Sequence, residues 1–408
     1  MWRKNFAWKM SSLLVGGGLA FVFQIVAMRY LGPRGYGYWS LAISWAGLFA
    51  VLVDYGFNPL LSRDIARNPS EARSYLRSVI KGKMVLAICA GVLLLLTWRY
   101  TPAVSLSGKL LLVAFLYLCC ISTAESLQSI TSALEKFRLG AALSVLQKAL
   151  PALAGFFVIY TGGSELHLFI GVAALSFITV ISSFFRIQRE VRVSDSIKRH
   201  PLQPLLAAGL PLFLQNLFIL VYFRVDTLMI GHYTTPDQAG LYGAAYRFFE
   251  LSNVVPTALL AAWIAPLSKG IENKASVTQF YSVLKLFMGF ALLGIFLLEL
   301  LAWVSPHVLG PAYALARPVL MCLSLTLLFY FPNFLLTTML VFLGKPHWNM
   351  VLAGFCAVFN IGANMWGIPR WGAFAAAWTT LATEGLLFIF SLLAVQRLFE
   401  ARLSAKDV

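Results

Sequence analysis

Charged residues are scarce in this chain. Of its 408 residues only 12% are Asp, Glu, Lys or Arg, whereas about a quarter are charged in a typical soluble domain. Apolar residues make up 60% of the sequence, and acidic residues are the scarcest charged type, with 16 against 32 basic ones. A compact soluble domain has no place to bury so much apolar surface, so the composition predicts an integral membrane protein.

Several other features are absent from the sequence. It has no phosphate-binding glycine loop, no cluster of metal ligands, no sizeable soluble loop and no run of alternating ten-residue segments typical of a transmembrane barrel. The basic residues lie between apolar segments and not on one soluble face, which argues against a nucleic-acid partner. We therefore predict a non-enzymatic protein with no catalytic residue, no cofactor and no metal site. The five cysteines lie in apolar stretches and are read as packing residues: Cys89, Cys119, Cys120, Cys322 and Cys356.

The apolar stretches recur at lengths that suit membrane crossing, which takes about 20 residues in a helix. They predict an all-α integral membrane protein with about twelve transmembrane helices, the first of them an uncleaved N-terminal span. The predicted spans are residues 10–28, 39–57, 83–98, 110–134, 139–160, 166–185, 205–231, 240–268, 283–304, 318–343, 348–367 and 371–395.

The basic residues are distributed unevenly between alternate loops. With the N-terminus in the cytoplasm, 22 Lys and Arg residues fall in cytoplasmic segments and six in outer segments. Lys83 is counted among the cytoplasmic residues. The positive-inside rule then places both termini in the cytoplasm, which agrees with an even number of spans.

A short pattern occurs in both halves of the chain. Tyr30, Pro33 and Gly37 recur as Tyr233, Pro236 and Gly240 at a constant offset of 203 residues. Because six spans separate the copies, they share one membrane orientation and predict parallel repeats. We expect two six-helix lobes, residues 1–195 and 196–408, around a central cavity that holds the binding site.

Charged side chains at membrane depth are costly and usually face a cavity or a partner. In the fourth span a polar stripe of Ser122, Glu125, Ser129 and Ser132 follows one helix face, and helix packing by the serines is the alternative explanation. Lys148 lies mid-span and predicts a polar surrounding.

The seventh and eighth spans carry the densest charges: Arg224, Asp226, Arg247 and Glu250. The two arginines lie at matching depth, so they form either an internal Arg–carboxylate network or a site for an anionic ligand, and a guanidinium suits both. Three more acids lie at membrane depth. Asp54 is expected to pair with Arg63, and Glu299 and Glu384 have no assigned partner.

Taken together, several segments resemble the Wzx-type polysaccharide and O-antigen flippases, a branch of the superfamily of multidrug, oligosaccharidyl-lipid and polysaccharide exporters. The resemblance follows the chain in order through residues 29–42, 54–56, 63–67, 133–138, 147–148, 224–231, 240–250, 309–313 and 360–384. It implies a flippase that moves a polyprenyl-pyrophosphate-linked oligosaccharide from the cytoplasmic to the periplasmic leaflet of the bacterial inner membrane. It further implies alternating access driven by an ion gradient, and polysaccharide polymerase and chain-length proteins as partners.

Within that resemblance the buried charges take candidate roles. Lys148, Arg224 and Arg247 are the expected substrate-binding residues, lining one cavity and meeting the pyrophosphate or acidic sugars. Glu125, Asp226 and Glu250 are the expected ion-coupling residues, with a proton or sodium as the ion.

Three other functions are weighed against this one. A drug exporter of the same superfamily favours organic cations and an acid-dominated cavity, which three buried bases argue against. A membrane-embedded polysaccharide polymerase or ligase is expected to carry a large periplasmic loop, and the longest outer loop spans only about a dozen residues. The peptidoglycan-precursor flippases usually carry fourteen spans, whereas this sequence predicts about twelve.

Overall fold

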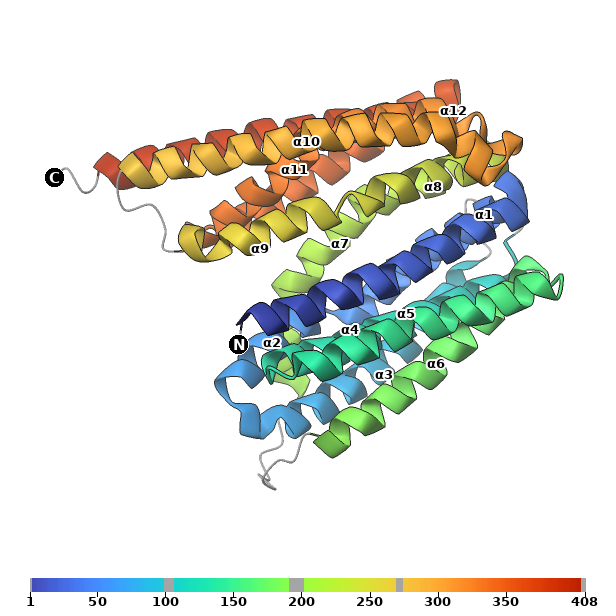
Figure 1. Ribbon diagram of the computed structural model, residues 1–408, viewed down its shortest axis with the longest axis horizontal. Coiled ribbons are helices and arrows are strands. Elements are labelled where there is room, and N and C mark those ends of the chain that lie inside the picture. Colours follow the sequence, from blue (N-terminus) through green and yellow to red (C-terminus); the bar gives the residue numbers. More distant parts are fainter. Residues whose placement is uncertain (1, 99–105, 191–201, 269–273, 405–408) are drawn as a thin grey trace. The chain divides into compact units, whose positions relative to one another are not determined.

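The fold is described by a computed structural model that covers residues 2–98, 106–190, 202–268 and 274–404 (Figure 1). The described residues are almost entirely helical and include no strand, which confirms the predicted all-α class. The helices are α1 (Trp2–Asp54), α2 (Phe57–Arg67), η1 (Pro69–Glu71), α3 (Ala72–Thr97), α4 (Gly108–Ala133), α5 (Phe137–Tyr160), α6 (Glu165–Glu190), α7 (Leu202–Tyr233), α8 (Pro236–Leu251), α9 (Val254–Ser268), α10 (Lys274–Leu309), η3 (Pro311–Tyr313), α11 (Ala316–Phe342) and α12 (Pro346–Ser404).

The membrane spans follow from these helices. Among the described residues, nine helices are long and apolar enough to cross a membrane. Two of the nine, α1 and α12, are each a pair of helices joined across a glycine of positive φ, Gly32 at 65° and Gly372 at 57°. Counting each pair as two spans raises nine to eleven, and α8 with α9 supplies a twelfth. The predicted spans all fall on these helices.

The chain divides into two compact units. The first holds Met1–Leu31 and Tyr38–Leu220, and the second holds Gly32–Gly37 and Val221–Val408. The predicted lobe boundary between residues 195 and 196 lies outside the described residues.

The core of the first unit forms around the short helix α2. Its apolar face buries Phe57, Leu61 and Ile65 against side chains of α3, α4, α6 and α7. Gly56 precedes α2 with φ at 71°, and a Cβ there would lie 2.6 Å from Leu212 Cβ, so glycine is required by both conformation and space. The close packing at Gly56 places the N-terminal end of α2, with Asn58, beside α4.

Helix α11 forms the centre of the second unit. It packs against α8, α10 and α12, and its fully buried side chains include Leu323, Leu327, Phe331 and Leu335. A helix that is apolar on nearly every side suits a protein interior or a membrane span. The same helix carries Asn333 into this interior, where the side chain is 4% exposed.

The two copies of the repeated sequence pattern contact each other reciprocally in the second unit. A Cβ added to Gly37 would lie 1.8 Å from the Pro236 carbonyl oxygen, and a Cβ added to Gly240 would lie 1.8 Å from the Pro33 carbonyl oxygen. Residues with equivalent positions in the two copies therefore exchange the same contact, as a two-fold relation between the copies requires.

Candidate functional site

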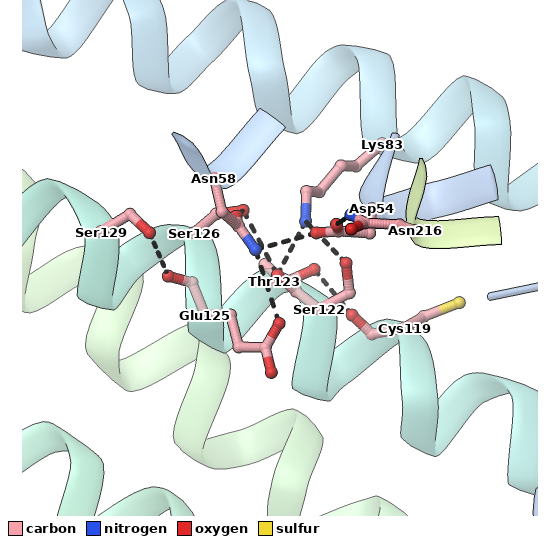
Figure 2. Close-up of polar contacts among 10 residues, drawn as sticks. All are labelled: Asp54, Asn58, Lys83, Cys119, Ser122, Thr123, Glu125, Ser126, Ser129 and Asn216. Carbon is pink, nitrogen blue, oxygen red and sulfur yellow. Dashed lines mark hydrogen bonds and ion pairs between the residues drawn. The ribbon is translucent and has the colours of Figure 1, made fainter. Parts of the chain in front are cut away.

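The polar stripe of α4 borders a cluster of polar side chains in the first unit (Figure 2). The main-chain oxygen and the Oγ of Ser122 each accept a hydrogen bond of 2.7 Å from Lys83 Nζ. Ser129 instead donates its Oγ hydrogen to the main-chain oxygen of Glu125 at 3.0 Å. Ser122 and Glu125 thus belong to the cluster, whereas Ser129 satisfies its hydroxyl on its own helix.

Lys83 is more deeply buried than its position at the start of an apolar run suggests. It was counted with the cytoplasmic residues, but α3 carries it into the interior, where its side chain is 3% exposed and Nζ lies 3.6 Å from Asp54 Oδ1. Arg63, the expected partner of Asp54, pairs instead with the adjacent Asp64 at 2.7 Å. The helix break at Gly56 separates Asp54 from Arg63 and explains the difference.

Two asparagines complete the cluster. Asn58 Nδ2 donates to Asp54 Oδ1 at 2.8 Å and to Glu125 Oε2 at 3.4 Å, and its Oδ1 accepts from Ser126 Oγ at 2.6 Å. Asn216 Nδ2 of α7 donates to Asp54 Oδ2 at 3.4 Å. Asn58 therefore connects the two carboxylates of the cluster, as Figure 2 shows.

Lys148 lies on α5 in the first unit and is half-buried. Its aliphatic stem passes over Gly16 of α1, where an added Cβ would lie 3.2 Å from Lys148 Cδ. The ammonium interacts electrostatically with Glu125, although the two form no ion pair of 4.0 Å or less in the described part of the chain. The predicted polar surrounding thus includes an acid of the neighbouring helix.

Arg224 and Arg247 share one carboxylate in the second unit. Arg224 Nη2 lies 3.0 Å from Glu250 Oε1, and Arg247 Nη1 lies 2.7 Å from Glu250 Oε2. The three side chains are between 24% and 28% exposed, and the Arg224 guanidinium also lies over the Tyr246 ring, 5.9 Å from its centroid. Two guanidiniums with one carboxylate carry a net charge of about +1, so the triad favours an anion.

Asp226 lies apart from this triad in a neutral, buried setting. Its side chain is 1% exposed and accepts hydrogen bonds from Tyr242 OH at 2.8 Å, Asn364 Nδ2 at 2.6 Å and Thr380 Oγ1 at 3.0 Å. Asn364 Nδ2 is also 3.0 Å from Asn360 Oδ1. The sequence analysis did not single out these donors.

The setting of Asp226 fits a small cation. Carboxylate, amide and hydroxyl oxygens are the ligands that hard cations prefer, and Asp226, Asn360, Asn364 and Thr380 supply them. The buried Asn364 Oδ1 has no hydrogen-bond partner among the described residues. Asn360 and Asn364 lie four residues apart, so they share one face of α12, and this spacing is the signal that sequence reasoning missed.

The remaining buried acids are held by neutral donors. Glu384 accepts from Tyr222 OH and, at 2.5 Å, from Asn333 Nδ2, and Glu299 accepts from Ser324 Oγ at 2.5 Å. No group of three or more His, Cys, Asp or Glu side chains that suits a metal ion occurs among the residues described by the structure.

Two family models match the chain. The family model "Polysaccharide biosynthesis protein" matches residues 2–270, and the MatE model matches residues 211–366. A comparison with curated proteins finds no match.

Solved structures share the fold over almost the whole chain. The lipid II flippase MurJ, in an inward closed conformation, has a TM-score of 0.72 at 16% identity, over 97% of this chain and 89% of its own. An inward-facing multidrug resistance MATE transporter has a TM-score of 0.70 at 16% identity, covering 95% of this chain and 96% of its own. A mutant of the Vibrio cholerae MATE transporter VcmN reaches 0.66 at 14% identity, covering 98% of this chain and 97% of its own.

These identities establish the fold, a 12-helix, two-lobe arrangement, and the family match extends over more than half of the sequence. The resemblance predicted from the sequence is confirmed. The chain belongs to the polysaccharide biosynthesis protein family.

Proposed function

We propose that this membrane transporter flips a polyprenyl-pyrophosphate-linked oligosaccharide from the cytoplasmic to the periplasmic leaflet of the bacterial inner membrane. The observation that carries the proposal is the triad of Arg224, Arg247 and Glu250, which keeps net positive charge at membrane depth while remaining about a quarter exposed. Isolated charge at that depth is costly, so an anionic ligand that offsets it is favoured.

The triad is suited to a pyrophosphate. A guanidinium binds phosphate oxygens through paired, charge-assisted hydrogen bonds. Here each arginine donates a hydrogen bond to a different oxygen of Glu250. An incoming phosphate would compete with the Glu250 carboxylate for these donors. Glu250 would then lose part of its pairing with the two arginines when substrate binds. A coupling residue needs such a link between substrate binding and its own charge.

Lys148 is assigned to the same substrate as a point charge. The residue is half-buried, and its aliphatic stem packs against the buried Gly16, where an added Cβ would lie 3.2 Å from Lys148 Cδ. We propose that it meets acidic sugars or a phosphate of that substrate, while the arginines provide the directional contacts.

Ion coupling is assigned to Asp226 and Glu125. Asp226 is surrounded by side chains that carry oxygen atoms. The neighbouring Asn364 Oδ1 has no hydrogen-bond partner among the described residues. We propose that a proton or sodium ion binds at the Asp226 carboxylate. Alternating access follows if cation binding and substrate binding favour different conformations of one protein. Both termini are placed in the cytoplasm by the Lys and Arg bias, and polymerase and chain-length proteins are the expected partners.

A drug exporter is the second candidate, because the MatE model matches residues 211–366. The two functions differ in the sign of the ligand. An organic cation would require a site of net negative charge, whereas the triad, about a quarter exposed, is positive.

Reconstituted proteoliposomes separate the two. The full chain is expected to move a fluorescent polyprenyl-pyrophosphate-linked oligosaccharide between leaflets and to leave an organic cation such as ethidium untransported. Transport of ethidium without flipping of the lipid-linked sugar would contradict the proposed substrate class.

A further inference from the structure

The cluster in the first unit contains two carboxylates and one ammonium. Lys83 Nζ donates two hydrogen bonds of 2.7 Å to Ser122, and it lies 3.6 Å from Asp54 Oδ1. Asp54 and Lys83 therefore form a pair with no net charge. Glu125 has no cation within 4.0 Å in the described residues, so its carboxylate is the one that this pair leaves uncompensated.

The exposure of the three groups falls from the surface inward. The Glu125 side chain is exposed in the first unit, the Asp54 side chain is 21% exposed and the Lys83 side chain is 3% exposed. Figure 2 shows Asn58 between the two acids, with Lys83 beside Asp54 and Ser122. Glu125 is thus the most exposed of the three groups, and the Asp54–Lys83 pair is more deeply buried.

The groups around Glu125 come from six helices. Asp54 belongs to α1, Asn58 to α2, Lys83 to α3, Ser126 and Cys119 to α4, Lys148 to α5 and Asn216 to α7. The charged groups are Lys83, Lys148 and Asp54. Among the described residues, the side chain that contacts the Glu125 carboxylate is the amide of Asn58. An ionised carboxylate at membrane depth without a contacting cation is costly, and protonation removes that cost.

We propose that Glu125 is an exchangeable proton site and that Asn58 transmits its occupancy to the buried Asp54–Lys83 pair. A hydronium ion delivers its proton to a Glu125 carboxylate oxygen, which forms an O–H bond and releases water. Asn58 Nδ2 donates one hydrogen bond to Asp54 Oδ1 at 2.8 Å and one to Glu125 Oε2 at 3.4 Å. Protonated Glu125 is neutral and accepts a weaker hydrogen bond from Asn58. The hydrogen bond from Asn58 Nδ2 to Asp54 then becomes stronger.

This inference deepens the proposed ion coupling by naming the ion, and its test is a binding measurement that does not involve transport. Purified full-length protein in nanodiscs is titrated with acid while infrared difference spectroscopy records the protonated carboxyl band. The Glu125→Gln variant keeps the size of the side chain and is expected to lose the band of about one titrating carboxyl per molecule. The matched control, Glu400→Gln, changes an exposed acid near the end of α12 and is expected to keep that band.

A double variant identifies which acid takes the proton. Lys83→Met with Asp54→Asn removes the pair without changing the net charge, so the Glu125 band is expected to remain. A band that persists in Glu125→Gln, or that disappears in the double variant with native helix content, would overturn the assignment to Glu125. A band suppressed by sodium at constant ionic strength would mark a metal-cation site and would also overturn it. Loss of flipping with an intact band would contradict the proposed function alone.

Discussion

Gly37 and Gly240 occupy equivalent positions in two copies of one sequence pattern, and each lies against the carbonyl oxygen of the proline in the other copy. An added Cβ at either glycine would come within 1.8 Å of that oxygen. Because the obstacle is backbone, no side-chain movement relieves the clash. Gly37→Ala and Gly240→Ala are each expected to destabilise the protein by about 3 kcal/mol or more, at or above the upper end for overpacking.

Thermal unfolding in detergent and abundance in the membrane measure this effect. Gly289→Ala is the control, because an added Cβ there meets no atom within 4 Å in α10. Unfolding temperatures for Gly37→Ala and Gly240→Ala equal to that of the control would show that α1 and α8 do not pack as described at these glycines.

The Asp54–Lys83 pair allows a second prediction. Lys83→Met leaves Asp54 without its cation, and breaking a buried pair on one side typically costs about 3 kcal/mol. Adding Asp54→Asn is expected to restore most of the lost stability in denaturant unfolding. Lys81→Met, which changes an exposed lysine two residues away, is expected to have little effect. An equal loss of stability in Lys83→Met and Lys81→Met would show that the pair of Lys83 with Asp54 does not stabilise the fold.

The position of Lys148 can be tested through its neighbour. An added Cβ at Gly16 would lie 3.2 Å from Lys148 Cδ, whereas at Gly17 it would meet nothing within 4 Å. Gly16→Val is therefore expected to displace the lysine stem and to reduce flipping several-fold, about 1 kcal/mol in transport efficiency, with Gly17→Val close to wild type. Equal activity of the two variants at equal abundance would argue against a role for Lys148 in binding substrate.

Asp226 provides a prediction on coupling. Asp226→Asn keeps the side-chain shape and removes the charge that a cation requires, so flipping is expected to lose its dependence on a proton or sodium gradient. Proteoliposomes with an imposed gradient measure this. Gradient-driven stimulation that survives in Asp226→Asn, at wild-type folding, would transfer the coupling role to another acid.

Much of the fold follows from sequence because apolar length and breakers are local signals. The predicted spans fall on the observed helices, and the repeated Pro and Gly positions of the two turns meet in space. Lys83 shows where this reasoning ends. Its position near the start of an apolar run suits a cytoplasmic lysine, and only the packing of α3 against α4 shows that its ammonium reaches Ser122.

The candidate site divides in the same way. The charges of Arg224, Arg247 and Glu250 stand out in an apolar sequence, and their spacing already suggested a network. The neutral partners of Asp226 cannot be recognised in the sequence. Asn364 and Thr380 lie more than 130 positions from Asp226 along the chain. Contacts of that kind depend on the tertiary fold and leave little trace in local pattern.

The central claim, that Arg247 recognises an anionic substrate, is tested most directly by export of glycan in a flippase-deletion strain. The strain carries Arg247→Lys, Arg247→Gln, or Arg247→Gln with Glu250→Gln, at matched abundance in the membrane. We expect Lys to retain partial export and Gln to reduce it at least tenfold, about 1.4 kcal/mol. The double variant should stay inactive although its pairing defect is relieved. Restored export in the double variant would make Arg247 a structural partner of Glu250 and contradict the claim.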